Sequence, residues 1–189
     1  MVTFACGGTI TLASTITNAA DIVVDGTGHQ VTISGGHAVR VFYVNTNVSF
    51  TVLNLTIADA KSFGGSAILN LGGSVNLAGV TLRSTTATIS VSNDTLSPKA
   101  GGGAIFNRGG TVNATNCAFL GNAAQTPGSS GTNLEIQVYG GAIRNEAGLV
   151  VLPSCAFLGN RASVEMWFLS QPQQPVTQVL AVPSTTAAR

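Results

Sequence analysis

The chain has 189 residues and a formal net charge of +1; 44% of its residues are hydrophobic and only 8% are charged. Soluble helices need a charged outer face and nucleic-acid-binding domains need clustered basic residues, so this composition argues against a helical domain and against a nucleic-acid partner. The apolar runs stop well before the roughly 18 residues that a membrane span needs. The sequence therefore predicts one all-β domain whose polar residues are mainly Thr, Ser, Asn and Gly.

The first part of the chain contains short β-rich runs separated by turn residues. These runs are Thr9–Leu12, Asp21–Asp25 and Val31–Ile33, with glycines between them. Strands this short are typical of a chain that turns a corner after a few residues. The N-terminal MVTFACGGTITL lacks the basic and apolar regions of a signal peptide. We therefore expect either a cytoplasmic chain or a leader outside this sequence.

The next segment, Val39–Ile57, alternates apolar and polar residues over much of its length, which is the period of a strand. It ends in Leu-Thr-Ile, and a matching Val-Thr-Leu lies at Val80–Leu82. Between the two, Gly65–Gly73 is a loose copy of a clearer motif that begins at Gly102. This part of the chain thus contains an early member of a repeat.

The clearest repeat is Gly102–Asn122, GGAIFNRGGTVNATNCAFLGN, which returns at Gly140–Asn160 as GGAIRNEAGLVVLPSCAFLGN. The two copies align at one constant offset from end to end, and no gap is needed. Self-similarity at a fixed period is the signature of a stacked architecture. With the looser copy at Gly65–Gly73 and a weaker one before it, the sequence predicts a one-dimensional coil of strands.

The bare turn of this coil is predicted to be as long as the separation of Leu55 from Val80. The next two separations, Val80 to Cys117 and Cys117 to Cys155, are both longer, so extra residues are inserted there. The insertions coincide with residues 84–100 and 124–139, which are rich in Ser, Thr, Asn, Gly and Pro. We expect surface loops, and on stacked repeats such loops often form the binding face.

Equivalent positions of the three copies are apolar and are predicted to point inward, stacked about 4.8 Å apart. These columns are Val75, Val112 and Val150; Leu77, Ala114 and Leu152; Val80, Cys117 and Cys155; and Leu82, Phe119 and Phe157. Two polar columns, Asn70 with Asn107 and Asn145, and Asn122 with Asn160, are expected to hold corners of the coil, because Asn tolerates left-handed backbone and bonds to the amide above it. The alternative is that these asparagines line a ligand groove.

The paired GGAI and FxxN motifs, Gly102–Ile105 with Phe119–Asn122 and Gly140–Ile143 with Phe157–Asn160, resemble the repeats of the chlamydial polymorphic outer membrane proteins. More broadly, Thr3–Asn160 resembles the parallel β-helix proteins of the pectin-lyase-like superfamily. The resemblance implies a right-handed parallel β-helix with surface loop insertions, in a secreted or cell-surface protein of adhesin-like or structural role. The chain departs from the surface-protein pattern because neither a leader nor an anchor is recognisable in it.

Enzymes of that superfamily need clustered carboxylates, either for calcium or as an acid and a base about 5 to 10 Å apart. The acidic residues are Asp21, Asp25, Asp59, Asp94, Glu135, Glu146 and Glu165. The six acidic residues from Asp25 onward all occupy different repeat positions, so they form no column of acids. Asp21 and Asp25 could share one face of a strand, but Asp25-Gly26 is a turn dipeptide, which favours a role of Asp25 in a turn. Convergence of acids with Arg40, Arg108 or Arg144 in one groove would favour an enzyme, and scattered acids would not.

The histidines and cysteines predict no site. His29 and His37 lie among glycines without a neighbouring acid or cysteine, so a metal site or catalytic dyad is not expected. Cys117 and Cys155 are expected to be small buried hydrophobes, as Val80 is in the same column, with a disulfide between them as the alternative. Cys6 is expected to be unpaired.

Together these observations predict a parallel β-helix at residues 1–160 and a cap or irregular tail at residues 161–189, in which Trp167 and Phe168 cover the last turn. We expect a non-catalytic, secreted or surface-displayed protein that binds a glycan or a host or cell-surface protein through the loops at 84–100 and 124–139. No catalytic, cofactor-binding or metal-binding residue is predicted. The alternative is a fragment of a polysaccharide lyase or glycoside hydrolase with the pectin-lyase-like fold.

Overall fold

The computed structural model describes residues 1–88, 99–126 and 137–163. Regular structure in these residues is entirely β-strand, and the strands pair in parallel. The described part contains no helix that is long and apolar enough to cross a membrane. The prediction of an all-β chain is confirmed.

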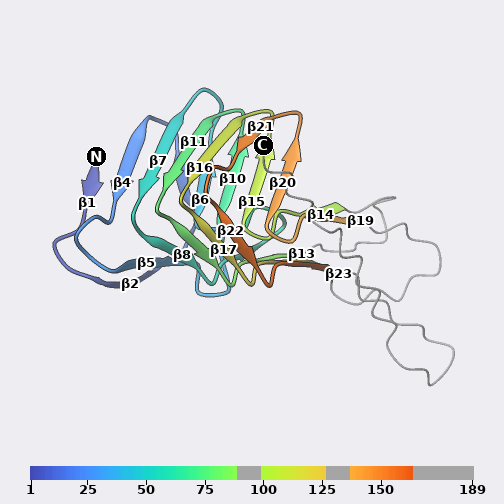
Figure 1. Cartoon of the computed structure of the whole chain (residues 1–189), viewed down its shortest axis with the longest axis horizontal. Helices are drawn as coiled ribbons and strands as arrows, with labels where there is room; N and C mark the ends of the chain where they lie inside the picture. The colour runs from blue at the N-terminus through green and yellow to red at the C-terminus, as the bar shows by residue number, and fades with distance from the viewer. Residues whose placement is uncertain (89–98, 127–136, 164–189) are drawn as a thin grey trace, which may run out of the picture.

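The chain runs repeatedly through the same sheets in the same order. A strand of sheet A is followed by one of sheet B and then one of sheet C, and each return adds a parallel strand beside that of the previous pass (Figure 1). The strand orders are β1-β4-β7-β11-β16-β21 in sheet A, β2-β5-β8-β12-β17-β22 in sheet B and β3-β6-β10-β15-β20 in sheet C. We number these passes from the N-terminus, so that each begins with a strand of sheet A.

The strands of the first three passes are short, as the spacing of turn residues predicts. Pass 1 contains β1 (Val2–Thr3), β2 (Gly8–Thr11) and β3 (Ile16–Asn18), and pass 2 contains β4 (Ile22–Asp25), β5 (Val31–Ser34) and β6 (Phe42–Val44). Pass 3 contains β7 (Ser49–Leu53), β8 (Thr56–Ala58), β9 (Lys61–Ser62) and β10 (Ile68–Leu71). Val39–Ile57, which alternates in sequence, is thus divided among three sheets.

Strands between sheets B and C begin with β9 in pass 3 and are more numerous in passes 4 and 5. Pass 4 contains β11 (Ser74–Ala78), β12 (Thr81–Arg83), β13 (Thr86–Thr88), β14 (Lys99–Gly101) and β15 (Ile105–Arg108); pass 5 contains β16 (Thr111–Thr115), β17 (Ala118–Leu120), β18 (Ala123–Gln125), β19 (Gln137–Tyr139) and β20 (Ile143–Glu146). Pass 6 contains β21 (Leu149–Val151), β22 (Ala156–Leu158) and β23 (Arg161–Ser163). Sheet D has the order β9-β13-β18-β23, and β14 pairs with β19 as sheet E.

The turn lengths follow the prediction. Val75 pairs with Phe50 across the short turn, and it pairs with Val112 across the first of the longer turns. Val112 in turn pairs with Val150 across the second longer turn. The prediction of surface loops at 84–100 and 124–139 is wrong at their described ends, because β13 and β18 pair in sheet D and β14 and β19 pair as sheet E. Thr85, Ala87 and Ala124 are buried there because these strands complete the wall of the coil. The rest of the predicted loops, residues 89–98 and 127–136, and most of the predicted tail, residues 164–189, lie outside the described residues.

Corners between sheets are made by residues with positive φ. At the corner from sheet A to sheet B, passes 3 to 6 each have one residue with φ between 51° and 63°. These residues are Asn54, Gly79, Asn116 and Ser154. Glycine has no Cβ to clash in this conformation, and the short polar side chain of asparagine tolerates it. The glycines and asparagines that punctuate the repeat therefore bend the chain at fixed places.

The predicted inward columns are confirmed. The eight members of passes 4 and 5 are buried, and the rings of Phe119 and Phe157 stack with centroids 4.6 Å apart and planes inclined by 1°. Phe157 is 46% exposed, and Val150, Leu152 and Cys155 are only half-buried, because pass 6 is the last described pass. Each inner residue is thus covered by its counterparts in the neighbouring passes.

The asparagine columns are also confirmed. Asn70 Nδ2 donates to Asn107 Oδ1 at 2.8 Å, and Asn107 Nδ2 donates to Asn145 Oδ1 at 2.7 Å. Each of these amides also donates to the backbone carbonyl three residues later, closing the corner from sheet C to sheet A. We call this row of three amides the asparagine ladder.

The second polar column contains one residue that the sequence comparison did not find. Asn122 Nδ2 donates to Asn160 Oδ1 at 2.9 Å, as expected. The pass before it carries Thr85, whose Oγ1 donates to Asn122 Oδ1 at 2.7 Å and lies within hydrogen-bond distance of the Gly103 carbonyl. A threonine hydroxyl therefore takes the place of an amide in this column.

Candidate functional site

The acidic residues of the described part do not gather in one groove. Asp21 Oδ1 accepts a hydrogen bond from the Ser49 backbone N–H at 2.8 Å. Asp25 Oδ1 accepts one from the Thr27 backbone N–H, also at 2.8 Å, and hydrogen bonds from the Thr27 hydroxyl and backbone lower the pKa of Asp25. The Asp25 carboxylate thus holds a backbone turn, as the Asp25-Gly26 dipeptide predicts, whereas the Asp21 carboxylate joins the starts of two neighbouring passes. Asp94, Glu135 and Glu165 lie outside the described residues.

Asp59 lies at the corner from sheet B to sheet D, where it faces two basic side chains. Its Oδ1 is 3.9 Å from Nε2 of His37 and 3.9 Å from an Arg83 nitrogen. His37 therefore has an acidic neighbour, which its position in the sequence did not predict. Both basic side chains are exposed, so this is a loose surface cluster, and among the described residues no group of three potential metal ligands occurs.

The three arginines singled out in the sequence do not converge with acids either. Arg40 donates to the backbone carbonyls of Gly64 and Gly65, and burial lowers the pKa of its guanidinium. Arg108 is exposed. Arg144 is the exception, because it pairs with Glu146 on the same strand, β20.

Arg144 anchors the strand that follows the second insertion. Its guanidinium carbon lies 4.8 Å from the ring centroids of both Phe106 and Tyr139. Its aliphatic part passes so close to Gly101 that a Cβ there would lie 2.4 Å from Cδ of Arg144. The arginine is thus held between sheet C and sheet E with its charge balanced by Glu146. It fixes the base of the insertion and is not free to bind a substrate.

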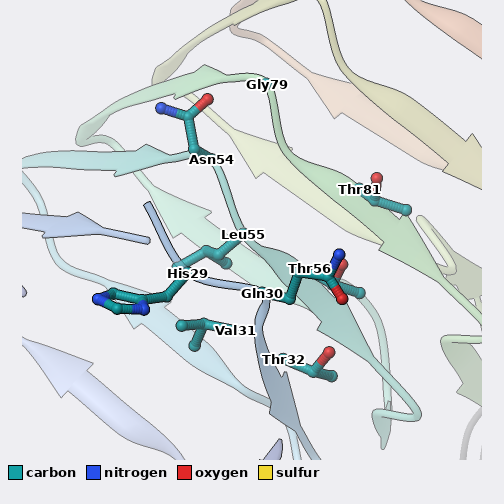
Figure 2. Close-up of a pocket in the computed structure, with 9 residues that line it drawn as sticks. All are labelled: His29, Gln30, Val31, Thr32, Asn54, Leu55, Thr56, Gly79 and Thr81. Atoms are coloured by element: carbon teal, nitrogen blue, oxygen red, sulfur yellow. The ribbon is translucent and has the colours of Figure 1, made fainter. Parts of the chain in front are cut away.

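A shallow polar groove of about 360 Å³ lies on the outer face of sheet B, in passes 2 to 4. Its lining residues are His29, Gln30, Val31, Thr32, Asn54, Leu55, Thr56, Gly79 and Thr81, which Figure 2 shows as sticks. None of them is an acid, a lysine or an arginine. We call this surface the threonine groove.

The threonines of the groove are a consequence of strand register. Thr32, Thr56 and Thr81 pair with one another on β5, β8 and β12, and Thr9 extends the row in pass 1. Their neighbours Ile33, Ile57 and Leu82 are buried, so the threonines point outward by the alternation of a strand. Figure 2 shows the three hydroxyl-bearing residues on successive strands. The sequence contains this row as the repeated Thr-Ile or Thr-Leu, of which the match between Leu55–Ile57 and Val80–Leu82 is a part.

The wall of the groove is the corner from sheet A to sheet B. Pass 2 turns here through the longer segment Gly26–Gln30, whereas the next passes turn at the single residues Asn54 and Gly79. Asn54 Nδ2 donates to Thr27 Oγ1 at 2.7 Å, which joins the two corners. A Cβ on Gly79 would lie 2.5 Å from Asn54 Oδ1, so only glycine leaves room for this amide.

The cysteines offer no reactive centre in the described residues. All three are free thiols; Cys6 is exposed, Cys117 is buried and Cys155 is half-buried. The alternative of a disulfide between Cys117 and Cys155 is therefore wrong. Burial raises the pKa of the Cys117 thiol, and its Sγ lies 3.3 Å from the Thr115 carbonyl oxygen.

Comparison of the chain with models of protein families, with curated proteins and with solved structures found no match.

Proposed function

We propose that the chain is a right-handed parallel β-helix of the pectin-lyase-like kind. The support is the recurring path through sheets A, B and C, in which each pass is in register with the next. Connections between parallel strands of one sheet are right-handed in about 98% of cases, which favours this hand for the coil. The asparagine ladder and the GGAI and FxxN motifs agree with the same architecture.

We propose further that the protein is a non-catalytic binding protein, secreted or displayed on a cell surface. Its ligand is a glycan, held in the threonine groove and by the inter-repeat loops at residues 84–100 and 124–139. The observation that carries this proposal is the threonine groove itself. Three in-register hydroxyls and the amides of Gln30 and Asn54 line it.

These groups match the chemistry of a sugar. A threonine hydroxyl donates and accepts hydrogen bonds, and so does an amide side chain, so both suit a ligand rich in hydroxyls. Strand spacing repeats the hydroxyl about every 4.8 Å, giving a regular row along which a chain of sugar units can lie. The groove contains no carboxylate, so it has no acid and base pair for hydrolysis. Its chemistry favours binding without turnover.

A binding experiment with two matched variants tests the groove. The double change Thr56→Val and Thr81→Val removes two hydroxyls at nearly constant shape, and we expect it to weaken binding of a selected oligosaccharide about tenfold or more. Thr51→Val, on the outer face of sheet A, is the control and should leave affinity unchanged. The measurement is a screen on immobilised oligosaccharides followed by calorimetric titration. Equal loss in both variants, or no binding at all, would reject the groove as a glycan site.

The loops need a separate experiment. Replacing residues 89–98 or 127–136 by short Gly-Ser linkers removes only those parts of the insertions. If the loops contact the glycan, each replacement should weaken the binding that the groove variants also weaken. Unchanged affinity would limit the site to the groove.

The alternative function, a fragment of a polysaccharide lyase or glycoside hydrolase, has a direct assay. Polygalacturonate is incubated with the protein and calcium, and new reducing ends or unsaturated products are measured. Because the described acids lie apart and hold turns or pair with basic residues, we expect no product above the blank. Measurable turnover would replace the binding proposal with the enzymatic one.

A further inference from the structure

The outer face of sheet C differs from that of sheet A. Its outward side chains in passes 2 to 4 include Tyr43, Leu69, Leu71 and Phe106, which alternate with buried neighbours on β6, β10 and β15. Tyr43, Leu69 and Phe106 pair in register and so form one row across three adjacent strands (Figure 1). The outward positions of sheet A in passes 3 to 5 instead carry mainly Ser, Thr and Asn. We call the four residues of sheet C the apolar face.

The apolar face is a wall of the coil that its own packing does not need. The inward columns already fill the interior, and all four residues of the face point away from it. Among the described strands, those that pack closely with β6, β10 and β15 belong to sheet C itself. The four side chains are half-buried, so part of each is accessible. A contiguous group of large apolar side chains on the outside of a soluble fold is typical of an interaction site.

The charge around the apolar face is positive. Arg108 points outward at the end of β15 and is exposed. Arg40, just before β6, donates to two backbone carbonyls at 2.9 and 3.0 Å, so neutral groups surround its charge. The acid on the described strands of sheet C is Glu146, and it pairs with Arg144. In the described residues, therefore, no carboxylate pairs with Arg40 or Arg108.

These features favour a protein segment over other occupants. A sugar stacks on an open aromatic ring, but the guanidinium carbon of Arg144 already lies 4.8 Å from the centroid of the Phe106 ring. A second copy in a twofold contact would bring the same unpaired arginines to the other side of the interface. An anionic membrane gains only about 1 kcal/mol from each basic residue near its surface, which is little for two arginines.

We propose that the apolar face is a docking surface for a segment of another protein, in which apolar side chains are flanked by carboxylates. The apolar side chains pack on Leu69 and its neighbours, and the carboxylates are attracted to Arg108 and Arg40. Tyrosine and arginine are enriched among the residues that contribute most to protein–protein binding, and charge complementarity selects the partner. The face shares no residue with the threonine groove and does not depend on glycan binding.

Peptides selected from a phage-displayed random library on the full chain are the probes. The selected peptides should combine Leu, Ile or Phe with Asp or Glu. For each of them, a matched peptide with Asn and Gln in place of Asp and Glu should bind about fivefold or more weakly. Fluorescence anisotropy measures the affinities at low and at physiological salt. The difference between the paired peptides should shrink as the salt concentration rises, because salt screens exposed charges.

Three variants locate the contact. Leu69→Ser removes an apolar side chain at the centre of the face and should weaken binding of the acidic peptides about tenfold or more. Arg108→Gln changes an exposed side chain, so it should leave the fold intact and weaken binding about two- to fivefold. Leu53→Ser makes the same change on the outer face of sheet A and is the matched control, which should leave the affinity unchanged.

Four results would overturn the proposal. The first is that no selected peptide loses affinity for the Leu69→Ser protein while keeping it for the Leu53→Ser protein. The second is equal affinity for the acidic and the neutral peptides. The third is flotation of the protein with phosphatidylserine vesicles that Leu69→Ser abolishes, which would identify a membrane as the occupant. The fourth is a dimer in analytical ultracentrifugation that Leu69→Ser dissociates, which would identify a second copy of the chain.

Discussion

The interior of sheet C differs between the early and the middle passes. In passes 3 to 5 the column contains Asn70, Asn107 and Asn145, whose amides form the asparagine ladder. In passes 1 and 2 the same column contains Asn18 and Val44, and no ladder forms. The early passes instead bury large apolar side chains such as Phe42 of pass 2, whose ring centroid lies 4.7 Å from that of Phe50 in pass 3.

This contrast shows that one coil is stabilised in two ways. Where the ladder is present, each amide joins neighbouring passes and also closes its own corner, so the sequence must repeat to keep donors and acceptors aligned. Where apolar side chains fill the same space, any residues of suitable volume suffice, and the repeat is free to drift. The early passes are therefore hard to recognise as copies although their register is regular.

The largest effect is expected from the apolar interior of the early passes. Phe42→Ala, in pass 2, removes a fully buried ring and should lower the free energy of unfolding by about 3 to 5 kcal/mol. Phe63→Ala, at a side chain that is 70% exposed, is the matched control and should change it by less than about 0.5 kcal/mol. Urea unfolding followed by circular dichroism measures both. A small loss for Phe42→Ala would mean that the early passes are stabilised by something other than apolar burial.

The ladder should respond to loss of an amide in a way that the early passes do not. Asn107→Leu removes the hydrogen bonds that Asn107 makes with Asn70, Gly110 and Asn145. We expect the free energy of unfolding to fall by about 2 to 4 kcal/mol. The equivalent change in pass 1, Asn18→Leu, should cost nothing or stabilise the fold, because Asn18 Nδ2 has no hydrogen-bond acceptor in the described residues. Similar losses at both positions in urea unfolding would remove the distinction between the two regions.

A smaller effect separates two adjacent glycines at one corner of the ladder. Gly110→Ala would place a Cβ 2.3 Å from Asn70 Nδ2, so we expect a loss of about 1 to 3 kcal/mol. Gly109→Ala meets no atom within 4 Å and is disfavoured only by its φ of 75°, so its loss should be about 1 kcal/mol. Thermal unfolding compares the two variants. An equal loss would show that the ladder tolerates displacement.

The smallest effect concerns thiol reactivity rather than stability. Cys6 in pass 1 is exposed and should react readily with iodoacetamide in the folded protein at about pH 8. The raised pKa of Cys117 lowers its thiolate fraction, and burial restricts access, so it should react only on unfolding. Because the folded pKa lies above the unfolded one, the stability from the neutral thiol is fully present below the unfolded pKa and is lost as the pH rises through the folded pKa. Mass spectrometry of labelled peptides checks the order, and rapid native labelling of Cys117 would contradict it.

Much of the fold could be predicted from residues that repeat. The copies beginning at Gly102 and Gly140 predicted the pairing of β15 with β20, the stack of Phe119 on Phe157 and the amide bonds of the asparagine ladder. The comparison of the copies did not identify Thr85 as a member of the Asn122 column, because Thr85 has a hydroxyl where the other members have an amide. The sequence also did not indicate that the described ends of both insertions pair as strands of their own sheet.

The candidate sites were much less predictable. The threonine groove repeats a Thr-Ile or Thr-Leu pair at nearly even spacing, but the repeat alone did not indicate that the outward hydroxyls line a groove beside the corner from sheet A to sheet B. The packing of Arg144 on two rings, and the approach of His37 to Asp59, join residues from different corners or strands. A distance between side chains is a property of the stacked coil, and no local pattern encodes it.

The sequence by itself determined the all-β class, the turn length and the inward columns, because alternation and repetition directly reflect which side chains must be buried in every pass. Only the tertiary structure decided which outward residues meet. It placed the outward row of three threonines beside a polar corner, and it placed Asn18 one valine away from the ladder. The physical reason is that burial acts on each residue separately, whereas a groove or an unsatisfied amide depends on the particular neighbours that stacking provides.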